Sequence, residues 1–163
     1  MIKKINFLFI TLFGLGKIKK IPGSFASLVS TIFLFFIFHI INFSPNIFLF
    51  ILLIIFIISI YCINIYIKEN DDKDPKEIVI DEFIGQSIPI SLYEIAHEAP
   101  KDQSDILKFY FIMFLLFRIF DITKPYPVSY YEKNFKNGFG VVMDDVCAGL
   151  YVVAIMVLYM VLT

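Results

Sequence analysis

Three long apolar segments constrain this chain more than any other feature of its sequence. Residues 24–42, 45–67 and 141–163 each approach the ~20 apolar residues with which an α-helix crosses the hydrocarbon core of a membrane. The composition agrees, because 59% of the residues are hydrophobic and 18% are charged, against roughly 45–50% and 25% in soluble domains. The sequence therefore predicts an all-α integral membrane protein with a single membrane domain over residues 1–163.

Two shorter apolar segments, residues 83–96 and 106–121, decide the predicted topology, because by length alone they could also be buried or re-entrant helices. If both cross the membrane, the protein is a bundle of about five transmembrane helices, two of them short. Every Lys and Arg except Lys101 and Lys108 then lies on one side, a bias that marks the cytoplasmic side. If residues 83–96 do not cross, this bias weakens and the polar clusters divide between two faces. We therefore predict five crossings.

The remaining segments are predicted to lie at the membrane surface. Two lysines precede the apolar residues 5–13, as in a signal peptide, but no small-residue cleavage site follows. Residues 1–22 are therefore predicted to form an uncleaved interfacial segment. The loops 68–82 and 122–140 are predicted to be cytoplasmic, so that the polar ends of all spans share one face.

Two pairs of adjacent acids each stand directly before an apolar run: Asp81 with Glu82, and Asp144 with Asp145. Each pair is predicted to begin a helix, where one acid contributes about 0.3–1 kcal/mol by interacting with the helix dipole. Capping requires one acid and not two. We therefore interpret the two pairs as oxygen ligands for a divalent cation such as Mg²⁺.

A cationic cluster ends the second short segment. Arg118, Asp121 and Lys124 are spaced by three, so they share one face of a helix that Pro125 and Pro127 terminate. One interpretation is an ion pair between Arg118 and Asp121, with Lys124 favoured by the helix C-terminus. We prefer a phosphate-binding role, because a charge near lipid is expected to be functional and Arg binds phosphate in a bidentate manner.

Glycines precede the first and the last long segments. Gly23 with Ser24, and Gly138 with Gly140, each lie where a helix is predicted to begin. Backbone N–H groups at a helix N-terminus bind anions. We therefore predict that these four residues assist phosphate binding, although glycines also form ordinary turns.

Several absences narrow the predicted reaction. The two histidines, His39 inside a span and His97 on the predicted outer side, lie away from the acids. Cys62 and Cys147 fall in apolar segments and are predicted to be core thiols. The chain has no Cys-x5-Arg loop, no G-x4-G-K-[ST] loop and no Asp-x-Asp-x-[TV] motif. What remains is attack of a metal-activated water on a phosphoryl group, with a carboxylate receiving the proton.

The sequences KKIPGSFAS, VIDEFIG, FRIFDITKPYPV and NGFGVVMDDVCAG, in this order, resemble the bacterial phosphatidylglycerophosphatase A family. The resemblance covers about residues 14–155. It implies a Mg²⁺-dependent, multi-pass enzyme of the bacterial inner membrane with its active site on the cytoplasmic face. The implied reaction converts the phospholipid phosphatidylglycerophosphate into phosphatidylglycerol and inorganic phosphate. Ala26 stands where the family usually has a second glycine, and Asn137 stands where a glycine pair is common.

The predicted site residues fall into three overlapping groups. The predicted catalytic residues are Asp81, Arg118, Asp121 and Lys124. The predicted metal ligands are Asp81, Glu82, Asp144 and Asp145. The predicted phosphate-binding residues are Gly23, Ser24, Arg118, Lys124, Gly138 and Gly140.

Two other functions compete with this interpretation. A small ion-coupled transporter would use the acids as a cation site, but its charges should lie near the bilayer midplane. A lipid headgroup transferase would carry the DG-x2-AR-x8-G-x3-D-x3-D signature, which the chain lacks. The net charge of -1 gives no reason to expect a nucleic-acid partner.

Overall fold

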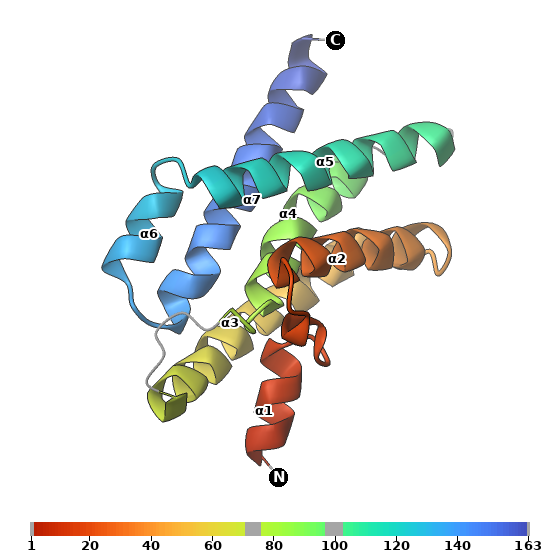
Figure 1. Ribbon diagram of the computed structural model, residues 1–163. Coiled ribbons are helices and arrows are strands. Elements are labelled where there is room, and N and C mark those ends of the chain that lie inside the picture. The colour runs from red at the N-terminus through yellow and green to blue at the C-terminus, as the bar shows by residue number, and fades with distance from the viewer. Residues whose placement is uncertain (1, 71–75, 97–102, 163) are drawn as a thin grey trace.

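A computed structural model describes residues 2–70, 76–96 and 103–162, and all regular structure in these residues is helical. The chain order is α1 (Ile2–Ile10), the short 3₁₀ helix η1 (Leu15–Lys17), α2 (Pro22–His39), α3 (Pro45–Asn70), α4 (Ile80–Ala96), α5 (Gln103–Thr123), α6 (Val128–Asn134) and α7 (Gly138–Leu162) (Figure 1). The predicted all-α class is thereby confirmed. The predictions for His97 and Lys101, and for part of the loop 68–82, concern residues outside the described ranges.

Three of the described helices, α2, α3 and α7, are long and apolar enough to cross a membrane. The two short predicted spans correspond to α4 and α5, which are not among them: α4 has only 17 residues, and α5 has 21 but includes the charged residues Lys108, Arg118 and Asp121. The five crossings therefore stay a prediction. Each of the five predicted spans lies within a few residues of a helix, and the largest omission is α6 inside the predicted loop 122–140.

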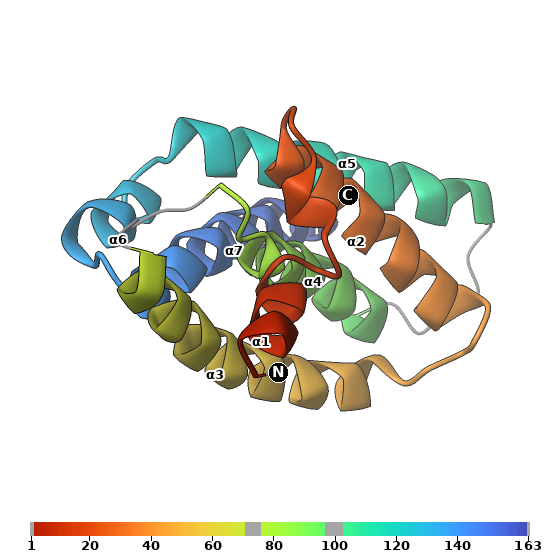
Figure 2. The same cartoon turned by 60° about the horizontal axis from the view of Figure 1, so that its bottom comes forward.

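Helix α4 lies at the centre of the bundle, between α2, α3, α5 and α7 (Figure 2). Its side chains from Ile80 to Tyr93 are nearly all buried, including the polar residues Gln86, Ser87 and Ser91. The Ser87 hydroxyl donates to the Phe83 carbonyl at 2.6 Å, so its polar group is satisfied within the helix. Because α4 contacts protein on its sides, it needs neither the length nor the apolar surface of a lipid-facing helix.

Two glycines let α4 and α7 approach each other at backbone distance. A Cβ atom at Gly85 would lie 2.6 Å from the Asp145 carbonyl oxygen and 2.7 Å from Phe117 Cε2. A Cβ atom at Gly149 would overlap the Gly85 carbonyl oxygen. Small residues at a helix contact permit this close packing in membranes. The contact places Asp145 beside the first turn of α4.

Replacing Gly85 by Ala is expected to destabilise the folded protein by about 1–3 kcal/mol, because the added methyl group overlaps backbone and ring atoms that cannot move freely. Thermal unfolding in detergent measures this as a lower Tm. Leu150→Ala is the control, since Leu150 is next to Gly149 but 50% exposed. Equal Tm values for wild type and Gly85→Ala would contradict the tight crossing.

The N-terminal segment is attached to the bundle beside the start of α4. The Asn6 side chain donates to the Cys62 carbonyl at 3.1 Å, and the Val79 N–H donates to the Ile10 carbonyl at 3.0 Å. The outer side of this segment is apolar, with Phe13 87% exposed. Its helix ends at Ile10, well short of the predicted extent 1–22, and its place at the membrane interface stays a prediction.

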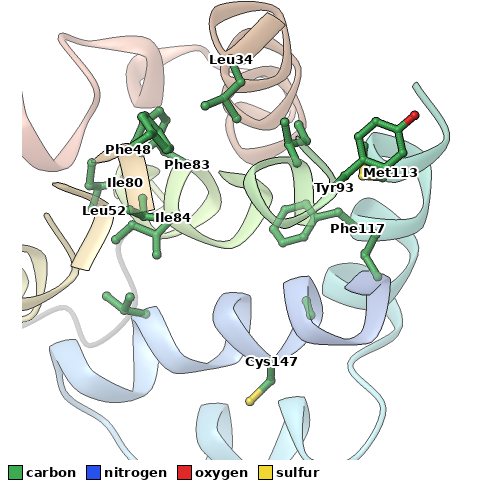
Figure 3. Close-up of a cluster of buried hydrophobic side chains, with 14 of the residues drawn as sticks. Leu34, Phe48, Leu52, Ile80, Phe83, Ile84, Tyr93, Met113, Phe117 and Cys147 are labelled. Atoms are coloured by element: carbon green, nitrogen blue, oxygen red, sulfur yellow. The ribbon is translucent and has the colours of Figure 1, made fainter. Parts of the chain in front are cut away.

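The hydrophobic core surrounds α4. Leu34 of α2, Ile84 of α4, and Met113 and Phe117 of α5 are almost completely buried and are among the side chains in Figure 3. Phe117 directly precedes Arg118. The core therefore anchors the end of α5 from which the predicted cationic cluster projects.

The end of the bundle formed by the last turns of α2 and α4 holds a separate polar group. His39 Nε2 lies 3.3 Å from Glu94 Oε1, and the Tyr110 hydroxyl donates to the same oxygen at 3.1 Å. His39 is therefore a largely buried residue beside a carboxylate, but its Nε2 makes no hydrogen bond among the described residues. The two cysteines are free thiols, with Cys147 buried and Cys62 half-buried.

Candidate active site

The sequence clusters converge on one pocket of about 510 Å³. It lies where α2, α4 and α7 begin and where α5 ends. The predicted site residues that line it are Gly23, Ser24, Asp81, Glu82, Arg118, Asp121, Lys124, Asp144 and Asp145. Segments that are far apart in the sequence thus form a single charged chamber at one end of an apolar bundle.

Three of the predicted metal ligands form a compact group. Asp81, Glu82 and Asp145 each offer a carboxylate oxygen, and these oxygens lie within 4.8 Å of one another. Asp81 and Asp145 are 8% and 3% exposed. Among the described residues, Asp81 Oδ1 and Glu82 Oε2 are buried without a hydrogen-bond partner. Such an all-oxygen donor set suits a hard divalent cation, which would offset the mutual repulsion of the carboxylates.

Asp144, the fourth predicted ligand, has other partners. Its Oδ2 lies 3.2 Å from Lys124 Nζ, and its Oδ1 accepts the Asp145 N–H at 2.9 Å. The expectation that Asp144 and Asp145 begin a helix was wrong, because α7 starts at Gly138. Consecutive residues inside a helix point in different directions. The pair therefore divides, with Asp145 toward Asp81 and Asp144 toward Lys124.

Arg118 and Asp121 form the ion pair that their spacing allows. Arg118 Nη1 lies 2.7 Å from Asp121 Oδ2 and 3.3 Å from the Ser27 hydroxyl, to which it donates. Both charged side chains are 15% exposed and line the pocket. Arg118 Nε is buried without a hydrogen-bond partner among the described residues. The guanidinium thus keeps an unused donor next to the pocket.

Lys124 is held between two carboxylates. Its Nζ lies 2.7 Å from Glu132 Oε1 and 3.2 Å from Asp144 Oδ2. Burial by itself would lower the pKa of Lys124, but the hydrogen bonds and charges of Glu132 and Asp144 outweigh it and raise that pKa above its usual value. Lys124 is therefore a permanent cation at the pocket wall.

Sequence reasoning missed Glu132, together with Lys76 and Lys136, which also line the pocket. Glu132 belongs to α6, a helix in the segment that Pro125 and Pro127 suggested to be a loop. The apolar and aromatic residues of VSYYEKN gave a weak helical signal, but no local pattern links Glu132 to Lys124. Only the tertiary fold brings α6 onto α7 and over the pocket.

The two predicted glycine sites differ. A methyl group at Gly23 would overlap Glu82 Oε1 and lie 3.4 Å from Arg118 Nη1, so the start of α2 touches the charged residues directly. The Gly138 N–H instead donates to Asn64 Oδ1 at 2.8 Å, and the Gly140 N–H to Asn137 Oδ1 at 3.1 Å. Capping of α7 already uses these donors. The predicted phosphate-binding role of Gly138 and Gly140 is therefore withdrawn.

Removing the charge of Glu132 is expected to lower kcat/KM about tenfold or more, because Lys124 loses the partner that fixes its position in the pocket. Steady-state kinetics of Glu132→Gln measure the effect. Glu69→Gln is a matched control, since Glu69 makes a 3.0 Å ion pair with Lys3 outside the pocket. Wild-type kinetics in Glu132→Gln would show that Glu132 does not fix the position of Lys124 for catalysis.

Apolar helices that carry buried carboxylates and fixed cations in one terminal pocket fit a membrane-embedded enzyme. The family model for Phosphatidylglycerophosphatase A matches residues 8–160, and the chain belongs to that family. The chain is thus a phosphatase. The resemblance in the four sequence clusters is confirmed, and the transporter alternative finds no support.

Individual relatives agree with this assignment. The chain is 32% identical to phosphatidylglycerophosphatase A of Haemophilus influenzae, over 88% of this chain and 81% of that protein. It is 27% identical to the Escherichia coli protein of the same name, over 85% of this chain and 73% of that protein. A putative phosphatidylinositol-3-phosphatase of Bacteroides thetaiotaomicron is 44% identical over 79 residues, 48% of this chain and 45% of that protein. No solved structure matches.

Proposed function

We propose that the protein hydrolyses the terminal phosphate of phosphatidylglycerophosphate, releasing phosphatidylglycerol and inorganic phosphate, with Mg²⁺ as its cofactor. The observation that carries the proposal is the group of Asp81, Glu82 and Asp145 in one pocket with Arg118 and Lys124. Catalysis of phosphoryl transfer rests mainly on positioning and on electrostatic stabilisation of the phosphoryl group, which a metal and fixed cations provide. A multi-pass protein of the bacterial inner membrane, with this pocket on the cytoplasmic face, would reach such a headgroup.

The metal would be held by Asp81, Glu82 and Asp145, where Mg²⁺ supplies charge neutralisation and a more acidic water. The unpartnered donor of Arg118 supports a role in binding the phosphoryl oxygens, with Lys124 as the second cation. Glu132 and Asp144 keep Lys124 in place.

The start of α2 adds neutral donors to this arrangement. The first N–H groups of a helix lack intrahelical partners, and Gly23 and Ser24 present that turn to the pocket. These donors suit an anion, such as an oxygen of the substrate phosphate or the released phosphate.

A carboxylate must receive the proton of the attacking water. Asp121 lines the pocket and is held by Arg118, so it either accepts this proton or orients the guanidinium. Asp81, with one oxygen unpartnered, is the second candidate. With either Asp121 or Asp81 as the base, the proton transfer takes place beside the bound phosphate.

The choice of substrate rests on the relatives that match most of this chain. Two of them are named for phosphatidylglycerophosphate, while the relative named for a phosphoinositide matches less than half of the chain. All of these names refer to phosphate monoesters on membrane lipids. The apolar helices beneath the pocket suit a substrate whose chains stay in the bilayer.

Phosphate release by the purified protein in mixed micelles tests the proposal. The substrates compared are phosphatidylglycerophosphate, phosphatidic acid, lysophosphatidic acid and phosphatidylinositol 3-phosphate. We expect the highest kcat/KM for the first, loss of activity on chelation and recovery with Mg²⁺. Preference for another lipid, or full activity in chelator, would contradict the substrate or the cofactor respectively.

The proposed sidedness has its own prediction. In a background lacking Cys62 and Cys147, single cysteines at Lys133 and Lys108 are expected to react with impermeant reagents from opposite faces, because these positions lie toward opposite ends of the bundle. Lys133 should react from the cytoplasmic side in inverted vesicles. Labelling of both positions from one side would rule out a membrane-crossing α5.

A further inference from the structure

A groove between α2 and α5 lies next to the active-site pocket and within the apolar part of the bundle. Its volume is about 230 Å³. The apolar side chains along it are Leu28, Ile32 and Phe35 of α2, and Leu107, Phe111 and Phe114 of α5. Ile32 is 61% exposed and Phe111 is 57% exposed, so the groove is open at the surface that faces lipid.

Two contacts between the helices show how the groove is connected to the pocket. At the pocket end, Arg118 Nη1 donates to the Ser27 hydroxyl at 3.3 Å. At the far end, the rings of Phe35 and Tyr110 meet edge to face with centroids 5.9 Å apart. The two helices therefore run antiparallel, and the contacts are separated by about 12 Å along each helix at 1.5 Å per residue. The groove occupies this interval.

The same helix faces continue into the active site. One turn before Leu28, Ser24 lines the pocket, and one turn after Phe114, Arg118 does so. Residues three or four apart share a helix face. The pocket and the groove therefore lie one helical turn apart on the same faces of α2 and α5, with the Arg118–Ser27 contact between them.

This continuity matches the chemistry of a lipid phosphomonoester, which joins a charged headgroup to apolar chains. We propose that the α2–α5 groove binds one acyl chain of the phospholipid whose terminal phosphate is held in the pocket. The proposal rests on the proposed function. A chain leaving the headgroup beside Arg118 has to pass only the Arg118–Ser27 contact to reach the groove one helical turn away.

The groove acts by orientation more than by affinity. Lipid tails are as apolar as Leu, so moving a chain from the bilayer into the groove gains little from the hydrophobic effect. Confining the chain does restrict the headgroup to one approach to the carboxylates and Arg118. Fixed orientation of a reacting group is a large source of rate enhancement.

A groove-filling variant tests this in the Mg²⁺-loaded, full-length enzyme. Ile32→Trp places an indole in the groove, and Ile57→Trp on α3 is the matched control, because Ile57 is 60% exposed and lines neither the pocket nor the groove. On dioleoyl phosphatidylglycerophosphate we expect Ile32→Trp to lower kcat/KM about tenfold, as for a mismatch in an apolar pocket. On the dihexanoyl form, whose chains are short, the kcat/KM of both variants should stay within about twofold of the wild-type value.

The outcomes separate the two proposals. Failure of wild type to release phosphate from any lipid would overturn the proposed function itself. Hydrolysis by wild type with equal kinetics for Ile32→Trp and Ile57→Trp would overturn only the groove. Equal losses of Ile32→Trp on both chain lengths would also overturn it, since the substitution would then act on the headgroup site or on folding.

Photocrosslinking of unmodified enzyme gives a second test that does not depend on a variant. Phosphatidylglycerophosphate with a diazirine in one acyl chain should label residues 28–35 and 107–114 in preference to α3. Excess unlabelled phosphatidylglycerophosphate should reduce this labelling, while excess phosphatidylcholine should not. Equal competition by both lipids would show that the groove holds bulk lipid and would overturn the proposal.

Discussion

Asn in place of Asp81 or Asp145 is expected to abolish measurable turnover while leaving the protein folded. Both acids belong to the buried three-carboxylate group, and each substitution removes a charged oxygen donor from it. Removal of an outer-shell partner of a metal ligand typically lowers metal affinity or activity by about 10–100-fold. We expect the loss of a direct ligand to lower them further. The measurement is kcat together with Mg²⁺ binding in detergent solution.

Two further variants make this result interpretable. Asp105→Asn is the control, because Asp105 is exposed, pairs with Lys108 at 2.8 Å and lies outside the pocket. Asp144→Asn should weaken Mg²⁺ binding less than Asp145→Asn, since Asp144 is directed to Lys124. Near-normal turnover in Asp81→Asn or Asp145→Asn would remove the metal assignment. Equal loss of Mg²⁺ binding in all three pocket variants would restore Asp144 as a ligand.

The second large effect is expected at Arg118. Arg118→Lys keeps the positive charge but loses the planar fork, and such a swap is not conservative where binding is bidentate. We expect kcat/KM to fall by about 10²–10³, the cost of removing one oxyanion donor in comparable sites. Kinetics in mixed micelles, with chain length held constant, measure the loss.

Ser27→Ala is the companion variant, because it removes one neutral contact of Arg118 and leaves the ion pair with Asp121 intact. Its activity should remain much closer to wild type than that of Arg118→Lys. Wild-type activity in Arg118→Lys would instead limit Arg118 to a structural ion pair at the end of α5.

Local sequence rules predicted the parts of the site that one helix determines. The spacing of Arg118 and Asp121 placed them on one face, and the structure joins them at 2.7 Å. The acids Asp81 and Glu82 were expected at a helix start and lie in the first turn of α4. Such relations follow from helical periodicity and from the boundary between polar and apolar residues.

Relations between helices were beyond these rules. Hydropathy describes how apolar a segment is, but it does not show whether its neighbours are lipid or protein. The short length of residues 83–96 allowed a buried helix, but the sequence did not predict that α4 would be the centre of the bundle. Adjacent Asp144 and Asp145 were treated as one pair, although α7 begins at Gly138 and consecutive side chains inside a helix point in different directions. Glu132 was missed because its contact with Lys124 depends on how α6 packs.

The crossing of α4 and α7 bears on which ion the proposed metal site would select. Asp81 lies one turn before Gly85, and Asp145 lies one turn before Gly149, so the two carboxylates extend from the place where the backbones touch. Mg²⁺ requires oxygens at about 2.0–2.1 Å, whereas Ca²⁺ accepts about 2.3–2.6 Å. Side chains larger than hydrogen at these glycines would separate the helices and enlarge the space between the acids. Discrimination between small and large cations would then be a property of two residues that carry no functional group.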